Sequence, residues 1–295
     1  MHLLRTETRL LEEAETAVDL AQTPAEILFL SFSDSDLTLL AAAAQGRPQN
    51  APSLRLANLS LLKHPYSVDL YVEKAARHAR FVLVRLLGGL DYWRYGVEEL
   101  SRAAGDKNFA LAIVPGDSMI DARLDAASSL PISDLRRIHQ VFQEGGTEHL
   151  TPLFHFIASF ANAKPTWREI PALKERPAAG RFEAGCRKRA WPRGQALILF
   201  YRSFMVAEDT EAILALADAL AAQEISVTTI FVSSLKDSDA IAFLRAELAE
   251  VKPDVIVNTT GFSARLTNES VLDASGVAVL QAIFSGATEA QWKEN

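Results

Sequence analysis

Cysteine is almost absent from this sequence, and so are long apolar runs. Cys186 is the only cysteine among the 295 residues, so an intrachain disulfide and a cysteine-rich zinc site are both excluded. No apolar run reaches the roughly 20 residues that a membrane-spanning helix needs. The first residues are too acidic and too interrupted for a secretory signal. The sequence therefore predicts a protein of the reducing cytoplasm.

Basic residues are fewer than acidic residues, and histidine is scarce. The chain has 30 basic and 37 acidic residues, for a formal net charge of −7, and only six histidines. A mildly acidic chain argues against a general nucleic-acid-binding surface. His149 and His155 are not spaced to share one helical face within a turn, so we predict no metal site there.

The most informative stretch runs from residue 80 to residue 100. It begins with the apolar run Phe81–Val84, which is short and rich enough in β-branched residues for a buried strand. The run leads to Gly88 and Gly89, and Tyr92 and Trp93 follow. Ligands of α/β folds bind outside the carboxyl ends of the strands, where these residues should lie. The alternative is that the glycines only form a turn and that the aromatic residues only pack.

The first half of the chain alternates strands with helices. We predict strands at 27–30, 54–62, 81–87 and 109–114, separated by helices at 37–44 and 67–79 and after the glycine pair. This rhythm indicates a parallel sheet with helices on both faces. The polar stretch 31–36 could bind a ligand or metal, but its composition favours a helix cap.

The middle of the chain has a different character. Helices are expected at 134–142 and 147–163. At the start of the chain, residues 7–20 are expected to form a helix or an ordered segment that leads into the first strand. Residues 165–194 are rich in proline and glycine and contain the basic cluster 187–189, which is a composition typical of a linker. For the basic cluster, a solvated surface is favoured over binding to an anionic ligand.

A second alternation of strands and helices begins near residue 196. Strands are expected at 197–201, 225–232, 254–258 and 277–284, with helices at 209–222 and 237–250. Polar residues follow successive strands, so Arg202, Ser233, Asn258 and Thr259 are expected at one edge of the sheet. Helix capping explains most of them individually.

These patterns predict an α/β fold with two doubly wound, Rossmann- or flavodoxin-like parallel-sheet domains. The predicted domains are 1–130 and 195–295, joined by a helical segment and linker at 131–194. The chain stops soon after a strand, so we expect the second domain to be truncated at its C-terminus.

Several short motifs resemble the large subunit of aerobic cobaltochelatase, of the CobN type. They lie in the expected order at 22–27, 30–31, 34–37, 85–93, 145–146, 201–203, 231–237 and 258–263. The related magnesium chelatase large subunit shares the architecture, but the run LLGGLDYW at 86–93 is more similar to CobN. The resemblance extends from about residue 20 to the end, and the family's large subunit is several times longer.

The resemblance implies a subunit of a ligase that forms nitrogen–metal bonds in cobalamin biosynthesis. The family inserts cobalt(II) into hydrogenobyrinic acid a,c-diamide, using ATP with magnesium. The partners that it implies are AAA+ and integrin-like subunits of the CobS and CobT type. The family's residues for metal insertion lie beyond this chain, so no catalytic residue is assigned and the isolated chain is expected to be inactive. It is expected to bind no cofactor or metal of its own.

Aromatic faces suit a flat macrocycle and arginines suit its carboxylates. The residues expected at a corrinoid cleft are therefore Arg85, Tyr92, Trp93, Tyr201, Arg202 and Asn258. Two alternatives remain: a cytoplasmic two-domain module that binds a small ligand, and a scaffold that only docks the ATPase subunits.

Overall fold

The computed structural model describes residues 16–107, 109–117, 119–144, 146–160, 176–260 and 271–284. The chain divides into two units, 1–174 and 175–295. Within the described ranges, no helix is both long and apolar enough to cross a membrane. Parts of some predictions lie outside these residues: the helix at 7–20 before residue 16, the linker at 165–175, and the motif glycines Gly145 and Gly261.

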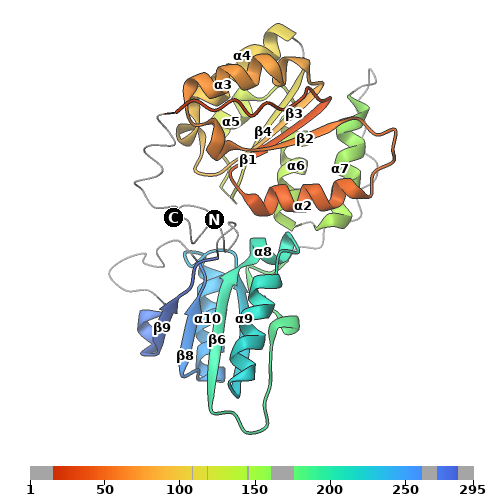
Figure 1. The fold of residues 1–295 in the computed structure, drawn as a ribbon. Coiled ribbons are helices and arrows are strands. Elements are labelled where there is room, and N and C mark those ends of the chain that lie inside the picture. The colour runs from red at the N-terminus through yellow and green to blue at the C-terminus, as the bar shows by residue number, and fades with distance from the viewer. Residues whose placement is uncertain are drawn as a thin grey trace. The chain divides into compact units, whose positions relative to one another are not determined.

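The first unit is built on a parallel sheet (Figure 1) with the strand order β2-β1-β3-β4. Its strands are β1 (Ile27–Ser31), β2 (Leu54–Asn58), β3 (Phe81–Leu86) and β4 (Ala110–Pro115). Every residue of β1 and β3 is buried, as expected for central parallel strands covered on both faces. The predicted strand 54–62 ends early because the Asn58 side chain accepts a hydrogen bond from the N–H of Ser60 (2.9 Å) and caps a short 3₁₀ turn, η1 (Leu59–Leu62).

Helices cover both faces of this sheet. One face carries α3 (Pro65–Lys74), α4 (Arg94–Lys107) and the short α5 (Ala122–Ala127), with short 3₁₀ turns η2 (Ala76–His78) and η3 (Leu90–Tyr92) between elements. The other carries α2 (Asp34–Gln45), α6 (Ile132–Glu144) and α7 (Thr147–Ser159). The Ser33 hydroxyl caps α2 by accepting a hydrogen bond from the N–H of Asp36, as the polar stretch 31–36 predicted.

The helices after residue 131 belong to the first unit and do not form a separate segment. Phe142 of α6 stacks on Phe29 of β1 with ring centroids 5.6 Å apart, and Phe156 of α7 lies edge-on to Phe81 of β3. Their apolar stripes therefore complete the second face of the first sheet. The boundary between the units falls at 174/175 and not at 130 and 195, because the sequence pattern cannot reveal which sheet a helix covers.

The second unit has a mixed sheet with the order β5-β7-β6-β8-β9. Its parallel strands are β6 (Gly194–Tyr201), β7 (Ile225–Val232), β8 (Val255–Asn258) and β9 (Ala278–Gln281). The α/β fold class is thus confirmed, with one addition: β5 (Ala179–Arg181) pairs antiparallel to β7. Gly180 of β5 lies under the Phe231 ring, where a Cβ would come within 2.7 Å of Cζ.

Helices flank the second sheet on opposite faces. Ile213 and Ala217 of α9 (Glu211–Ala222) pack on one face, and Ala240 and Leu244 of α10 (Ser238–Val251) pack on the other. Shorter turns are α8 (Arg202–Val206), η4 (Glu183–Gly185) and η5 (Asp273–Ser275). Arg181 ties β5 to α10 through ion pairs to Glu247 (2.6 Å) and Glu250 (2.7 Å).

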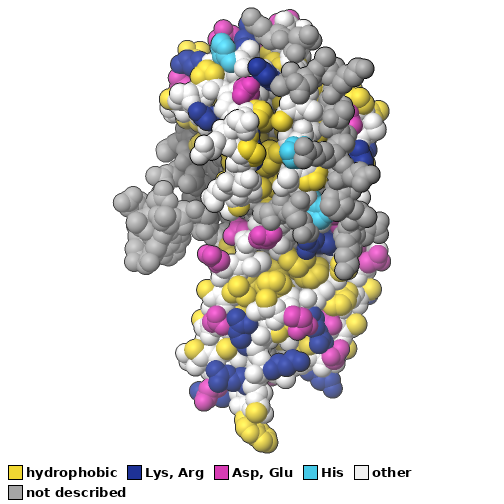
Figure 2. All heavy atoms as spheres, turned by 90° about the vertical axis from the view of Figure 1, so that its right-hand side faces the viewer, with side chains coloured by type: hydrophobic (Ala, Val, Ile, Leu, Met, Phe, Trp, Pro, Cys, Tyr) yellow, Lys and Arg dark blue, Asp and Glu magenta, His cyan; other side chains and the backbone are white. Residues whose placement is uncertain are grey.

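The basic cluster 187–189 lies in this unit on an ordinary charged surface. Arg187 donates to the carboxylate of Asp218 on α9 (2.6 Å), and Arg189 donates to the carbonyl of Ala221. Figure 2 shows basic and acidic side chains interspersed over the face of this unit that is turned to the viewer. Arg187 and Arg189 thus hold contacts within the second unit.

Candidate functional site

A hollow of about 430 Å³ opens at the carboxyl edge of the first sheet. It lies between the loop after β3 and the loop after β4, the place where doubly wound sheets bind ligands. Its walls include Gly88 and Gly89 on one side and Met119, Ile120 and Asp121 on the other. Met119 is 74% exposed and Ile120 is 53% exposed, so the mouth of the hollow is apolar.

The glycine pair shapes one wall of the hollow. Gly88 and Gly89 have φ values of 84° and 73°, a region that residues with a Cβ rarely adopt. A Cβ on Gly88 would lie 3.1 Å from the ring of Tyr92. Tyr92 is 44% exposed and meets Phe32 edge-on at 5.0 Å. The exposed ring of Tyr92 therefore packs against Gly88, one of the residues that line the hollow.

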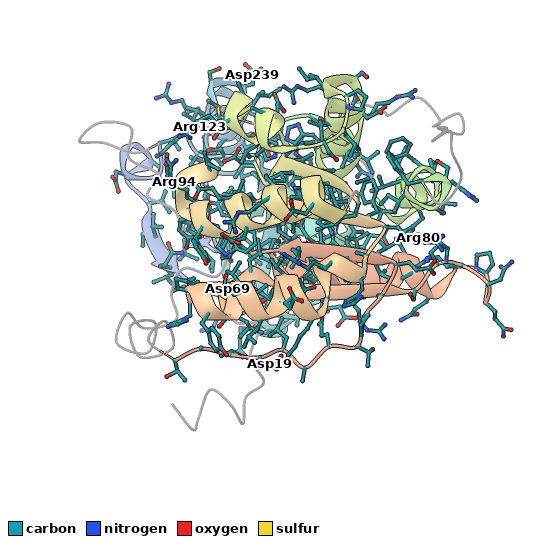
Figure 3. All side chains as sticks on the ribbon, turned by 90° about the horizontal axis from the view of Figure 1, so that it is seen from above. Asp19, Asp69, Arg80, Arg94, Arg123 and Asp239 are labelled. Atoms are coloured by element: carbon teal, nitrogen blue, oxygen red, sulfur yellow. The ribbon has the colours of Figure 1, made fainter. Side chains whose placement is uncertain are left out.

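Two aspartates and two arginines form a charged rim. Arg94 of α4 and Arg123 of α5 both pair with Asp91, and Arg123 also pairs with Asp121 (2.8 Å). Figure 3 shows the two arginines at the same end of the unit, opposite Arg80. Hydrogen bonds from Arg123 lower the pKa of Asp121 to about 2. The rim thus carries ionised carboxylates and guanidinium groups side by side.

A larger hollow of about 520 Å³ lies at the other end of the sheet. Arg80, Phe109 and Ala110 line it, and these residues stand at the amino ends of β3 and β4. Ligands of parallel α/β sheets bind at the opposite, carboxyl edge. The smaller hollow beside Gly88 and Gly89 is therefore the better candidate.

Arg85 is not at the hollow but in a buried ion pair. Its guanidinium pairs with the carboxylate of Asp36 on α2, and it donates to the carbonyl of Gly116 (2.9 Å). Asp36 also accepts a hydrogen bond from the Ser31 hydroxyl (2.7 Å), and the ring of Phe142 lies 5.0 Å from the guanidinium carbon. Only 8% of Arg85 is exposed. Its charge joins three elements of the carboxyl edge instead of facing a ligand.

His139 of α6 lies close to this ion pair. Its Nε2 is 2.7 Å from the carbonyl oxygen of Asp117, which places the ring proton on Nε2 as the donor. Burial lowers the pKa of His139, and the positive charge of Arg85 lowers it further. The folded protein thus favours the neutral imidazole.

The stability of the first unit should therefore fall when the pH drops below about 6.5, the ordinary pKa of histidine. The unfolded chain takes up a proton there and the folded chain resists it, so the unfolding free energy decreases toward the lowered pKa, by at most about 1.4 kcal/mol per pH unit. Urea unfolding between pH 7.5 and pH 5 measures this slope. The His139→Gln variant keeps a donor for Asp117 and should show a flatter profile. An equally steep profile in that variant would assign the slope to other groups.

Trp93 is a core residue. It is 6% exposed, and its indole Nε1 donates to the carbonyl of Leu62 at 2.8 Å. It packs on the α3–α4 face of the sheet, whereas Arg85 lies beside α6 on the other face. Of the three residues that the sequence indicated in this unit, none lines the hollow itself, and Tyr92 is the one that contacts a lining residue, Gly88.

The second unit carries an internal polar network at its carboxyl edge. Asn258 is 6% exposed and donates to the side-chain oxygen of Gln281 (3.0 Å). The Asn258 oxygen accepts from the N–H and hydroxyl of Thr260, and Gln281 donates to the carbonyl of Thr260 (2.8 Å). The Thr259 hydroxyl donates to the carbonyl of Leu199 (2.9 Å). The bonds of Gln281 hold β9 to the end of β8, and the Thr259 bond holds that end to β6.

The other predicted residues of this edge hold local structure. Tyr201 is half-buried at the start of α8, and the Arg202 guanidinium donates to the carbonyl of Arg176 (2.9 Å). The Ser233 hydroxyl donates to Asp237, which caps α10. Burial opposes ionisation of Asp237, but the N–H of Ala240 and the Ser233 hydroxyl outweigh it and lower the pKa.

The described residues contain no gathering of three His, Cys, Asp or Glu side chains that would hold a metal ion. What they offer is a hollow with an apolar mouth and a rim of paired charges, with the ring of Tyr92 packed against Gly88 in its wall. Sequence reasoning missed Met119, Ile120 and Asp121. An exposed apolar pair in the loop that follows a buried strand was the available signal.

Comparison with known proteins agrees with this fold. The family model described as CobN/Magnesium Chelatase matches residues 139–295. The chain belongs to this family. The resemblance seen in the sequence motifs is thereby confirmed, and two curated relatives extend it over the whole chain.

Both relatives are aerobic cobaltochelatase subunits CobN. The protein from Sinorhizobium sp is 36% identical over 322 residues and the protein from Pseudomonas aeruginosa is 38% identical over 306, covering 99% and 100% of this chain. The chain spans only 24% of the length of each. The catalytic subunit of cobaltochelatase from Mycobacterium tuberculosis has a similar fold, with a TM-score of 0.53 at 22% identity, covering 91% of this chain and 22% of that one.

Proposed function

We propose that this chain forms part of the large subunit of an aerobic cobaltochelatase, which inserts cobalt(II) into hydrogenobyrinic acid a,c-diamide in the cytoplasm. The observation that carries the proposal is the 36–38% identity to CobN over essentially the whole chain. In this role the chain works with AAA+ and integrin-like chelatase subunits of the CobS and CobT type. ATP, magnesium and cobalt(II) are used by the complex and not held by this chain.

The proposed contribution of this chain is corrinoid binding at the hollow of the first unit. A corrinoid has a flat apolar body with acid and amide groups at its edge. Tyr92 supplies an accessible ring, Met119 and Ile120 supply apolar surface, and Arg94 and Arg123 supply charge at the rim. The ionised Asp91 and Asp121 between the arginines would favour amide over free acid groups at that edge.

Replacing Tyr92 with alanine should weaken corrinoid binding by about tenfold, which corresponds to about 1.4 kcal/mol. The variant would lose the contact between the exposed ring and the corrinoid, whereas the core of the first unit would lose little packing. Absorbance titration of the 295-residue chain with hydrogenobyrinic acid a,c-diamide measures the affinity. Ile132→Ala, which removes a 60% exposed side chain at the start of α6, is the matched control and should bind as the parent does.

The same titration, together with a pull-down of the AAA+ partner, distinguishes corrinoid binding from scaffolding. If the parent chain fails to bind the corrinoid but captures the AAA+ partner, its role is docking alone. If it binds neither, and cobalt insertion by the other subunits does not depend on it, the chelatase role itself is wrong.

A further inference from the structure

The last strand of the second sheet is exposed, and no described helix covers either of its faces. All four residues of β9 are exposed, including Leu280 at 59%, and Ile283 just beyond it is 57% exposed. Successive side chains of a strand point to opposite faces, so Val279 and Leu280 present apolar surface on both sides. Figure 1 shows β9 next to β8 at the edge of its sheet.

The strand at the same position in the first sheet, β4, is buried instead of exposed. The parallel strands run in the order β2-β1-β3-β4 in one sheet and β7-β6-β8-β9 in the other, so β4 and β9 are counterparts. Five of the six residues of β4 are buried. It is covered by α5, through Leu124, on one face and by α6 on the other. Parallel strands are normally covered in this way by helices on both faces.

Despite its exposure, β9 is held in the sheet by regular hydrogen bonding. It pairs in register with β8 from Val255↔Ala278 to Asn258↔Gln281. Both polar ends of the Gln281 side chain are used in the network with Asn258 and Thr260. The strand therefore has the regular pairing of an edge strand in a parallel sheet but lacks the covering layers that β4, its counterpart, has.

We infer that β9 is a docking strand for the remaining part of a CobN-type large subunit, which covers both faces of β9 with the apolar sides of helices. This rests on the proposed function. About three quarters of each CobN relative lies outside the region that this chain matches, so polypeptide for the missing layers exists in the subunit. A second copy of this chain fits less well, because edge-to-edge pairing of two β9 strands would leave the faces of both strands exposed.

A chimaera tests the inference. This chain replaces the matched portion of the Pseudomonas aeruginosa CobN, and Leu280→Cys is introduced in a Cys186→Ser background. A maleimide probe should label position 280 of the Leu280→Cys variant at least about tenfold more slowly in the chimaera than in the 295-residue chain, because covering the strand excludes the reagent. The control Ile132→Cys, exposed on the first unit, shows whether the reagent reacts normally in each protein. Equal labelling at position 280 in both proteins would overturn the inference.

Two further outcomes are decisive. Labelling that slows as the concentration of the 295-residue chain rises would assign β9 to a second copy of the chain.

In addition, Leu280→Glu should lower the unfolding midpoint of the chimaera by several degrees and that of the 295-residue chain by less than about one degree. Equal shifts in the two proteins would count against docking. Labelling is independent of cobalt insertion, so an inactive chimaera with a protected β9 contradicts only the proposed function.

Discussion

Replacing Asp36 with alanine is expected to destabilise the first unit by about 3–5 kcal/mol, the usual cost of leaving one partner of a buried ion pair alone. The Arg85 guanidinium would stay in a site where 9% of its side chain is exposed. Its Nε already lacks a hydrogen-bond partner among the described residues. It could not reach water without leaving the carbonyl of Gly116 and the ring of Phe142.

Hydrogen exchange of the β3 amides in the full chain measures this effect, and the β6 amides of the second unit serve as the internal reference. The double variant Asp36→Leu, Arg85→Met removes both charges and should be closer to the parent than Asp36→Ala is. Lys74→Ala removes the partner of Asp19 in an exposed pair and should change exchange little. If Asp36→Ala also changed exchange little, Arg85 would have another route to solvent and could be a ligand residue after all.

The sequence predicted the scaffold well because strand burial and helix capping are local signals. The central strands of both sheets have continuous apolar runs, and Ser33 and Asp237 stand where helices begin. By contrast, β5 has only three residues, Ala179–Arg181, within a stretch rich in proline and glycine. Its pairing depends on Phe231, some 50 residues away, so a local pattern could not reveal it.

The candidate site was harder to predict, for a related reason. An arginine at the end of a strand can face a ligand or an acidic side chain, and the partner of Arg85 is Asp36, 49 residues earlier in the chain. The sequence gives the positions of both residues but not the direction of their side chains. Likewise, Tyr92 and Trp93 are neighbours, yet the turn after Gly89 leaves the first accessible and buries the second.

Replacing Trp93 with alanine should cost about 3–5 kcal/mol of stability, as large truncations in a core do. The indole is buried among the residues of the α3–α4 face and loses its hydrogen bond to the carbonyl of Leu62. Weaker corrinoid binding in this variant would therefore report a damaged fold and not a lost ligand contact. Hydrogen exchange of the α4 amides measures the loss, and an unchanged exchange rate would contradict the core role.

Gly96 provides a sharper test of the same packing. Gly96 lies in the first turn of α4, and alanine is a better helix former than glycine by up to about 1 kcal/mol, but here a Cβ would overlap the Trp93 ring. Gly96→Ala should therefore destabilise the parent and stabilise the Trp93→Ala variant, where the ring is gone. This reversal of sign is a coupling between contacting residues that neither single substitution can show. If Gly96→Ala had the same sign in both backgrounds, the indole would not lie against α4, and a role for Trp93 at the ligand would be restored.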